Sequence, residues 1–225
     1  MTGPRVRPST PASLSLTAGL LAVVATVTML LAVSGWAPLI RLDRGIATGL
    51  HEVALHHPGW TRVQRFLSDW VWDPWTVRAV VAVLVLSLWR NGERMLALWF
   101  AVTLLVANVT QQVLKAALGR DRPQWAQPVD EAHFAAMPSG HAMTAAVGLG
   151  LLCWFTERMT ASSVLRITVL ALSVCSVVGV AFTRLFLGVH WFTDTLVGVL
   201  LGVAMVLAVR AQWLRNAPDA GAATS

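Results

Sequence analysis

The chain has 225 residues, of which 56% are hydrophobic and only 12% are charged, and its mean hydropathy is +0.64. This composition excludes an ordinary soluble domain and indicates an integral membrane protein. The formal net charge of +6 comes without a basic run or an aromatic-basic module, so we expect a membrane partner and no nucleic acid.

The chain begins with a short polar segment, residues 1–13, which contains three prolines and which we expect to be a disordered cytoplasmic leader. The apolar run Leu14–Val33 follows. A bilayer-spanning helix needs about 20 residues, whereas the apolar region of a signal peptide has about 7–15. We therefore expect a retained membrane helix, with cleavage near the small residues Ala32-Val33-Ser34 as the alternative.

The segment from residue 36 to 70 is mixed in character, with apolar residues at helical spacing before Pro58 interrupts the pattern. It predicts short interfacial amphipathic helices, the first of them capped by Asp43. His56 and His57 are adjacent and point in different directions on a helix, so a solvated interface is a better interpretation than a metal site.

Further apolar runs and their flanking tryptophans predict an all-α bundle of six transmembrane helices, which forms one domain over residues 14–209 and leaves a cytoplasmic tail at 210–225. The five later spans are Pro74–Trp89, Met95–Ala117, His141–Thr156, Arg166–Phe182 and Trp191–Val209. Lys and Arg are equally frequent on the two sides. Because several of the outer charges belong to the motifs described next, we place both termini in the cytoplasm and the motifs at the extracytoplasmic face of a multi-pass cell-membrane protein.

The most polar feature of the last two spans is the sequence Thr183–Asp194, which contains Arg184, His190 and Asp194. Each charged group inside a bilayer core costs roughly 2.5–3.5 kcal/mol, so three together require a functional reason. His190 and Asp194 are one helical turn apart, which lets the carboxylate hold one imidazole nitrogen and leaves the other as a nucleophile or base. Arg184 offers a planar fork that suits an oxyanion.

Two upstream motifs carry similar chemistry. Lys115 and Arg122 stand about two helical turns apart, and Pro123 ends any helix there. The sequence Pro138-Ser139-Gly140-His141 opens the next apolar run, where Ser139 is a candidate N-cap and free backbone N–H groups form an anion site. Each residue alone has a structural explanation, such as a helix-end lysine or a capping carboxylate, but all three motifs fall on one membrane face.

In order, the motifs are Lys115-x6-Arg122-Pro123, Pro138-Ser139-Gly140-His141 and Arg184-x5-His190-x3-Asp194. This set resembles the three-part signature of the type 2 phosphatidic acid phosphatase superfamily, which also contains the vanadium haloperoxidases. The resemblance covers about residues 95–205. Thr183 stands where this family usually has Ser, which keeps a hydroxyl group.

The resemblance implies a role for each motif residue. His190 would attack phosphorus to give a phosphohistidine, Asp194 would hold its ring, and His141 would protonate the leaving group and then activate water. The phosphate would be bound by Lys115, Arg122, Ser139, Gly140 and Arg184. The scheme needs no cofactor, and the sequence has no Asp/Glu cluster suited to Mg²⁺, so we expect a metal-independent enzyme.

A site at the bilayer face indicates a lipid monophosphate or diphosphate as substrate. The basic residues Arg41, Arg44, Arg62 and Arg65 tip the prediction slightly toward a polyprenyl diphosphate, with phosphatidic acid or phosphatidylglycerol phosphate as alternatives. A lipid phosphotransferase would use the same residues. A haloperoxidase is disfavoured because its relatives are soluble and larger, and a scaffold or transporter would not need both histidines. Arg120 and Asp121 receive no role and are interpreted as a surface loop pair.

Overall fold

The computed structural model describes residues 10–216 and is all-helical over that range, which confirms the predicted fold class. It contains eight α-helices and one π-helical turn, with no strand in the described part. Their bounds are α1 Pro11–Val33, α2 Ala37–His56, α3 Pro58–Phe66, η1 Leu67–Val71, α4 Pro74–Arg90, α5 Arg94–Leu118, α6 Gly140–Met159, α7 Ser163–Phe186 and α8 Phe192–Asn216.

Five segments are long and apolar enough to cross a membrane: α1, the run Pro58–Arg90 that ends with α4, α5, α7 and α8. Helix α6, the remaining predicted span, forms as a helix but is not among these five. Its sequence begins with Gly140 and His141 and ends with Glu157 and Arg158, which lowers its apolar character. The six-span count therefore stays a prediction.

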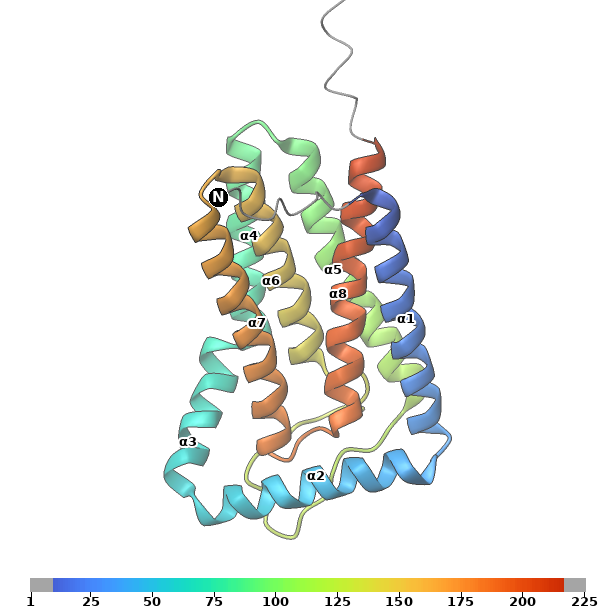
Figure 1. The fold of residues 1–225 in the computed structure, drawn as a ribbon. Helices are drawn as coiled ribbons and strands as arrows, with labels where there is room; N and C mark the ends of the chain where they lie inside the picture. The colour runs from blue at the N-terminus through green and yellow to red at the C-terminus, as the bar shows by residue number, and fades with distance from the viewer. Residues whose placement is uncertain (1–9, 217–225) are drawn as a thin grey trace, which may run out of the picture.

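Helix α6 lies inside the bundle and packs against α4, α5, α7 and α8 (Figure 1). Small residues allow α8 to approach it closely: a Cβ atom added at Gly198 would lie 2.7 Å from the Ser139 carbonyl oxygen, and one at Gly202 would lie 2.9 Å from the Met143 carbonyl oxygen. This close packing fixes the start of α6 against the second and third turns of α8. Ser139 N–H also donates to the Asp194 carbonyl oxygen at 2.9 Å.

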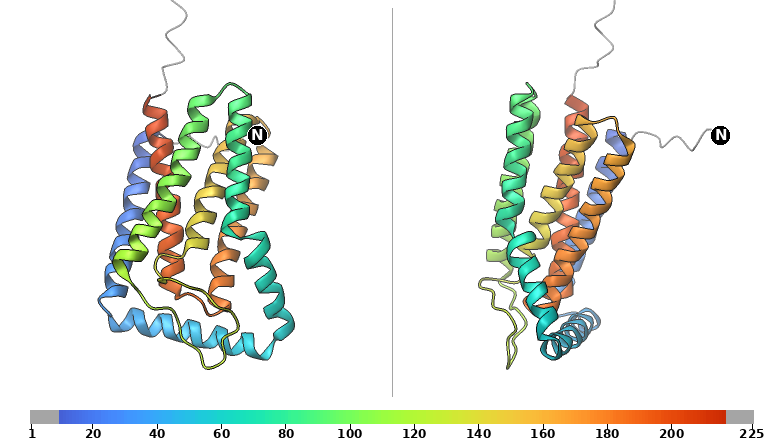
Figure 2. Two further views of the ribbon diagram at one scale, coloured as in Figure 1. Left: turned by 180° about the vertical axis from the view of Figure 1, so that it is seen from behind. Right: turned by 90° about the vertical axis from the view of Figure 1, so that its left-hand side faces the viewer.

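Helix α2 runs across one end of the bundle, nearly at right angles to the long helices (Figures 1 and 2). It is one continuous helix of 20 residues, longer than the short pieces that the sequence predicted, whereas α3 has nine residues and leads through η1 into α4. The prediction that Asp43 caps a helix is wrong. Asp43 lies within α2, is 1% exposed, and faces the bundle, because long-range partners described below hold it there.

The described helices extend beyond the predicted limits at both termini. Helix α1 begins at Pro11, with Thr10 as its N-cap, and α8 continues to Asn216, so parts of the predicted leader and tail are helical. The rest of both segments lies outside the described residues. The start of α1 and the end of α8 lie at one end of the bundle, and α2 lies at the other together with the segment that joins α5 to α6 (Figure 1).

Candidate active site

The three motifs meet at the end of the bundle that α2 covers, around a cavity of about 320 Å³. Six of the predicted site residues line it: Lys115, Arg122, Gly140, His141, Arg184 and His190. The other two, Ser139 and Asp194, are completely buried just behind it. The rest of the wall comes from polar side chains of α4, α5 and α6, from residues 73–75 and from residues 132–134 of the α5–α6 segment. The polar side chains are Arg78, Gln111, Gln112 and Thr144, and Asp73 adds one carboxylate.

His190 lies in the loop between α7 and α8, and not on the same helix as Asp194, because α8 begins only at Phe192. The two side chains still meet: His190 Nδ1 is 3.4 Å from Asp194 Oδ2. Asp194 also accepts a hydrogen bond from Trp191 N–H at 2.8 Å. The same carboxylate therefore caps the start of α8 and orients the His190 ring.

The hydrogen-bond partners of His190 determine its tautomer. A carboxylate only accepts and a guanidinium only donates, so Nδ1 carries the proton toward Asp194, and Nε2 accepts from Arg122 Nη1 at 3.1 Å. Burial lowers the pKa of His190 well below its usual value, and Arg122, Arg184 and Lys115 lower it further. The imidazole is therefore neutral, and its Nε2 lone pair points toward the cationic side of the cavity.

The cations around the cavity hold main-chain oxygens of the segment that joins α5 to α6. Lys115 Nζ donates to the Ala135 carbonyl at 2.8 Å. Arg122 donates to the carbonyl oxygens of Phe134 at 2.9 Å and of Val189 at 2.6 Å. Burial, and then the nearby charge of Arg184, lowers the pKa of Arg122 to about 10, which still leaves it charged at neutral pH.

Arg184 is 5% exposed and belongs to the last turn of α7. Its Nη1 donates to Ser68 Oγ at 2.7 Å and lies 3.8 Å from Asp130 Oδ2. Thr183 is also buried, but its hydroxyl donates to the Val180 carbonyl of its own helix. The hydroxyl group at this position, where the family usually has Ser, therefore bonds within α7 and not to the cavity.

Ser139 occupies the N-cap position of α6, as predicted, but its side chain makes no capping hydrogen bond. Its hydroxyl is buried without a partner, beside Gly140 at the cavity wall. An unpartnered buried hydroxyl is costly, and a bound anion would satisfy it.

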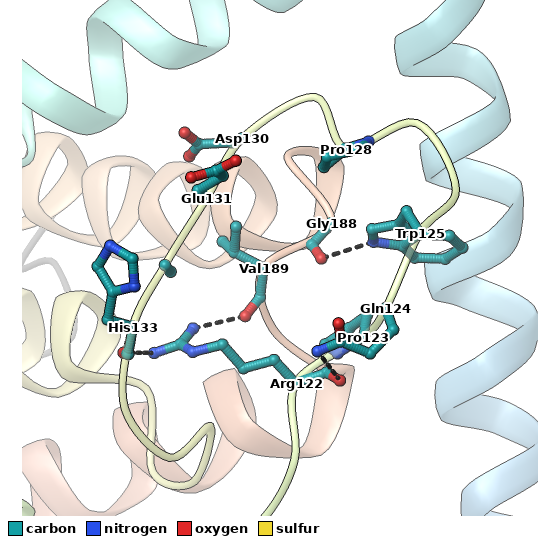
Figure 3. Close-up of a pocket in the computed structure, with 11 residues that line it drawn as sticks. Arg122, Pro123, Gln124, Trp125, Pro128, Asp130, Glu131, His133, Gly188 and Val189 are labelled. Atoms are coloured by element: carbon teal, nitrogen blue, oxygen red, sulfur yellow. Dashed lines mark hydrogen bonds between the residues drawn. The ribbon is translucent and has the colours of Figure 1, made fainter.

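A second cavity of about 270 Å³ lies on the other side of Arg122, between residues 122–133 and the loop at Gly188 and Val189 (Figure 3). Figure 3 shows the Arg122 side chain crossing this space to Val189 and His133, and Trp125 Nε1 donating to the Gly188 carbonyl at 2.8 Å. These bonds tie the α5–α6 segment to the His190 loop. The hydrogen bonds around the second cavity thus help to hold Arg122 and the loop that carries His190 in place.

Arg120 was missed by sequence reasoning, and its interpretation as a surface residue is wrong. Its Nη1 donates to Asp194 Oδ1 at 2.6 Å and to Thr193 Oγ1 at 2.7 Å, and its Nη2 donates to Asp43 Oδ2 at 2.7 Å. Asp43 in turn accepts from Thr193 N–H at 2.9 Å. The two buried carboxylates therefore share one guanidinium, which links α2 to the first turn of α8, next to the loop that carries His190.

The remaining histidines and arginines highlighted by the sequence lie away from this cavity. His56 and His57 direct Nδ1 to the carbonyl oxygens of Glu52 and Val53 in their own helix. Between residues 10 and 216, no group of three His, Cys, Asp or Glu side chains is placed to hold a metal ion. The basic residues that favoured a diphosphate do not line the catalytic cavity: Arg41, Arg44, Arg62 and Arg65.

Residues 96–218, more than half of the chain, match the PAP2 superfamily. The chain belongs to this superfamily. It is 34% identical over 104 residues to phosphatidylglycerophosphatase B of Bacillus subtilis, a match that covers 46% of this chain and 51% of that protein. The fold is similar to the crystal structure of a transmembrane PAP2-type phosphatidylglycerolphosphate phosphatase from Bacillus subtilis, with a TM-score of 0.75 at 21% identity over 92% of this chain and 96% of that one.

Proposed function

We propose that this PAP2 protein is a membrane-embedded lipid phosphatase that works through a phosphohistidine on His190. One observation carries the proposal: a neutral, buried imidazole directs Nε2 into a cavity that is also lined by Lys115, Arg122 and Arg184. A nucleophile beside several fixed cations suits transfer of a dianionic phosphoryl group, for which positioning and charge neutralisation supply most of the catalysis.

In the proposed reaction, His190 Nε2 forms a bond to phosphorus as the bond from phosphorus to the lipid oxygen breaks. His141, on the first turn of α6 at the cavity wall, gives a proton to the departing lipid oxygen. In the second step His141 takes a proton from water, whose oxygen forms a bond to phosphorus as the bond from phosphorus to His190 Nε2 breaks, which releases phosphate and restores the neutral imidazole. Asp194 stabilises the positive charge that develops on the His190 ring. Lys115, Arg122, Arg184, Ser139 and the Gly140 N–H bind the phosphoryl oxygens, and no step requires a metal ion.

The substrate is proposed to be a lipid monophosphate of the phosphatidylglycerophosphate type. The similarity to phosphatidylglycerophosphatase B supports this choice. The earlier preference for a polyprenyl diphosphate depended on Arg41, Arg44, Arg62 and Arg65, none of which reaches the cavity. A diphosphate remains the second candidate, because the cations of the three motifs could bind the terminal phosphate of either kind of lipid.

The proposed arrangement in the membrane has α6 as a sixth span, enclosed by the others. Both termini would then be cytoplasmic, and the cavity would open at the extracytoplasmic face beside α2. The amphipathic sequence of α2 and its course across the bundle end suit a position at the membrane surface.

The test is phosphate release by purified protein from phosphatidylglycerophosphate, phosphatidic acid and polyprenyl diphosphate, measured side by side with and without EDTA. His190→Ala should lose at least a thousandfold in kcat, whereas the matched control His56→Ala, at an exposed histidine, should keep wild-type activity. Denatured wild-type protein should retain ³²P from a labelled substrate in an acid-labile, base-stable form. Activity that survives in His190→Ala would disprove the nucleophile, and complete loss in EDTA would disprove the metal-free scheme.

A further inference from the structure

The catalytic cavity does not end at the phosphate-binding cations but adjoins an apolar groove between α4 and α5. The groove has a volume of about 540 Å³ and is lined by Arg78, Val81, Ala82, Val85, Leu86, Trp89, Ala101 and Leu104. Arg78 lines both the groove and the catalytic cavity, so it stands where the two meet. Figure 2, from behind, shows α4 and α5 adjacent near the turn that joins them, at the end of the bundle away from α2.

Arg78 is a cation without a matching anion. Its Nη2 donates to the neutral Asn108 amide oxygen at 3.1 Å, and its guanidinium carbon lies 4.7 Å from the centre of the Trp75 ring. None of the ion pairs between residues 10 and 216 involves Arg78. A charged group between apolar helices is costly, and Arg78 is half-buried in the second turn of α4, so a bound anion would give this guanidinium the charged partner it lacks.

The position of Arg78 relative to Lys115 favours a ligand whose two phosphate groups are separated along the molecule. Its partner Asn108 precedes Lys115 by seven residues on α5, which corresponds to about 10 Å along the helix axis. The phosphates of a diphosphate share one bridging oxygen and would both lie at the Lys115 level. A phosphomonoester joined through glycerol to a phosphodiester has a second negative charge farther along the molecule, toward the lipid tails.

We propose that Arg78 binds a second phosphate group of the lipid, the internal phosphodiester of a phosphatidylglycerophosphate-type substrate, and that the adjoining groove between α4 and α5 receives an acyl chain. This inference rests on the proposed phosphatase function and adds a residue that determines specificity. Arg78 distinguishes a substrate with two separated phosphate groups from phosphatidic acid, which has only the one that is hydrolysed.

The experiment compares kcat/KM of the wild type, Arg78→Gln, Arg78→Lys and the matched control Arg90→Gln, an exposed arginine at the far end of α4 that lines neither cavity. For phosphatidylglycerophosphate, Arg78→Gln should lower kcat/KM about ten- to a hundredfold, as expected for loss of a charge-assisted hydrogen bond. For phosphatidic acid the change should stay below threefold. Arg78→Lys should lie between, and Arg90→Gln should match the wild type on both lipids.

A second measurement changes the substrate, so its first part uses only the wild type and does not depend on the folding of a variant. Methylation of the internal phosphodiester removes its charge, and this neutral analogue should lose the same factor in kcat/KM as Arg78→Gln does. Combined with Arg78→Gln, the analogue should cause no further loss, because the two changes remove one interaction. Polyprenyl diphosphate is also measured, because its second phosphate group is the alternative ligand for Arg78.

The outcomes separate the two hypotheses. A wild type that releases phosphate from none of the three lipids disproves the proposed function itself. An active wild type with equal losses on phosphatidylglycerophosphate and phosphatidic acid, or with no loss on either, overturns the role of Arg78. A selective loss on polyprenyl diphosphate, with phosphatidylglycerophosphate unaffected, overturns the glycerol-spaced phosphodiester as its ligand.

Discussion

The Asp43→Asn substitution tests whether α2 positions the catalytic histidine through Arg120. Asp43 Oδ1 accepts from Thr193 N–H, while Oδ2 accepts from Arg120 Nη2 at 2.7 Å and from Thr193 Oγ1 at 2.6 Å. An asparagine of the same shape can keep the first bond only by turning its NH₂ group toward the guanidinium, which places donor against donor. If it turns the other way, it loses the bond to Thr193 N–H.

Either orientation removes at least one buried hydrogen bond that involves a charged group, which is worth about 1.5–3 kcal/mol. We expect the free energy of unfolding in detergent to fall by that amount. Arg120 would also shift relative to Asp194, which it contacts at 2.6 Å, and so displace the carboxylate that holds His190. A loss of 1.4 kcal/mol in transition-state stabilisation is tenfold in rate, so kcat should fall about tenfold or more while KM changes little.

The assay measures kcat and KM for lipid phosphate release together with thermal unfolding. Asp121→Asn is the matched control, because Asp121 is exposed and contributes only its main-chain oxygen, which accepts from Trp191 Nε1. Vanadate inhibition should be unchanged in both variants, since the phosphate-binding cations are intact. If Asp43→Asn keeps kcat within twofold of the wild type, α2 does not position the catalytic end of α8.

The other predictions concern the cations, the pH profile and the topology. Vanadate adopts a five-coordinate geometry like that of the phosphoryl transition state, so it should inhibit competitively, and insensitivity to millimolar vanadate would contradict the site. Arg122→Gln removes a charge that lowers the pKa of His190, so that pKa should rise and the acidic limb of the residual kcat/KM should move to higher pH. The shift should be larger than in Lys115→Gln, because Arg122 lowers the pKa of His190 more than Lys115 does. An unmoved limb would show that a different group controls it. A reporter fused after Arg215 should be cytoplasmic, and a cysteine at Gln127 should react with an impermeant thiol reagent from outside; labelling only in broken membranes would reverse the topology.

The sequence predicted the long helices well because an apolar run and the residues at its ends are enough to mark such a helix. The predicted run Pro74–Trp89 became α4, Pro74–Arg90, and Met95–Ala117 became α5, Arg94–Leu118. Each apolar run is bounded by proline, glycine or charged residues that mark helix ends. Gly119, for example, adopts φ +57° directly after α5, a conformation that favours glycine and ends the helix there.

Six of the residues selected by motif spacing line one cavity, but the spacing did not reveal how they are held. The expectation of one helical turn between His190 and Asp194 was wrong in detail, since a loop carries the histidine and the pair forms across the start of α8. No local signal marks Asp43 as a partner of Arg120, because 77 residues separate them along the chain. The Arg-x-Arg spacing of Arg120 and Arg122 was the one available hint that both side chains are used.

In the structure, the cations that would bind phosphate donate hydrogen bonds to neutral main-chain oxygens. Lys115 and Arg122 donate to the carbonyls of Ala135 and Phe134, and a phosphate oxygen with a formal negative charge is a stronger acceptor than either. Phosphate binding therefore exchanges neutral acceptors for charged ones, and the cations stay hydrogen-bonded and ordered before substrate arrives. The segment that gives up these bonds includes Phe134, which is 89% exposed and has φ 68°, so few packing contacts oppose its displacement. In the proposed reaction, substrate binding would therefore be coupled to release of the α5–α6 segment, because Lys115 and Arg122 would serve both.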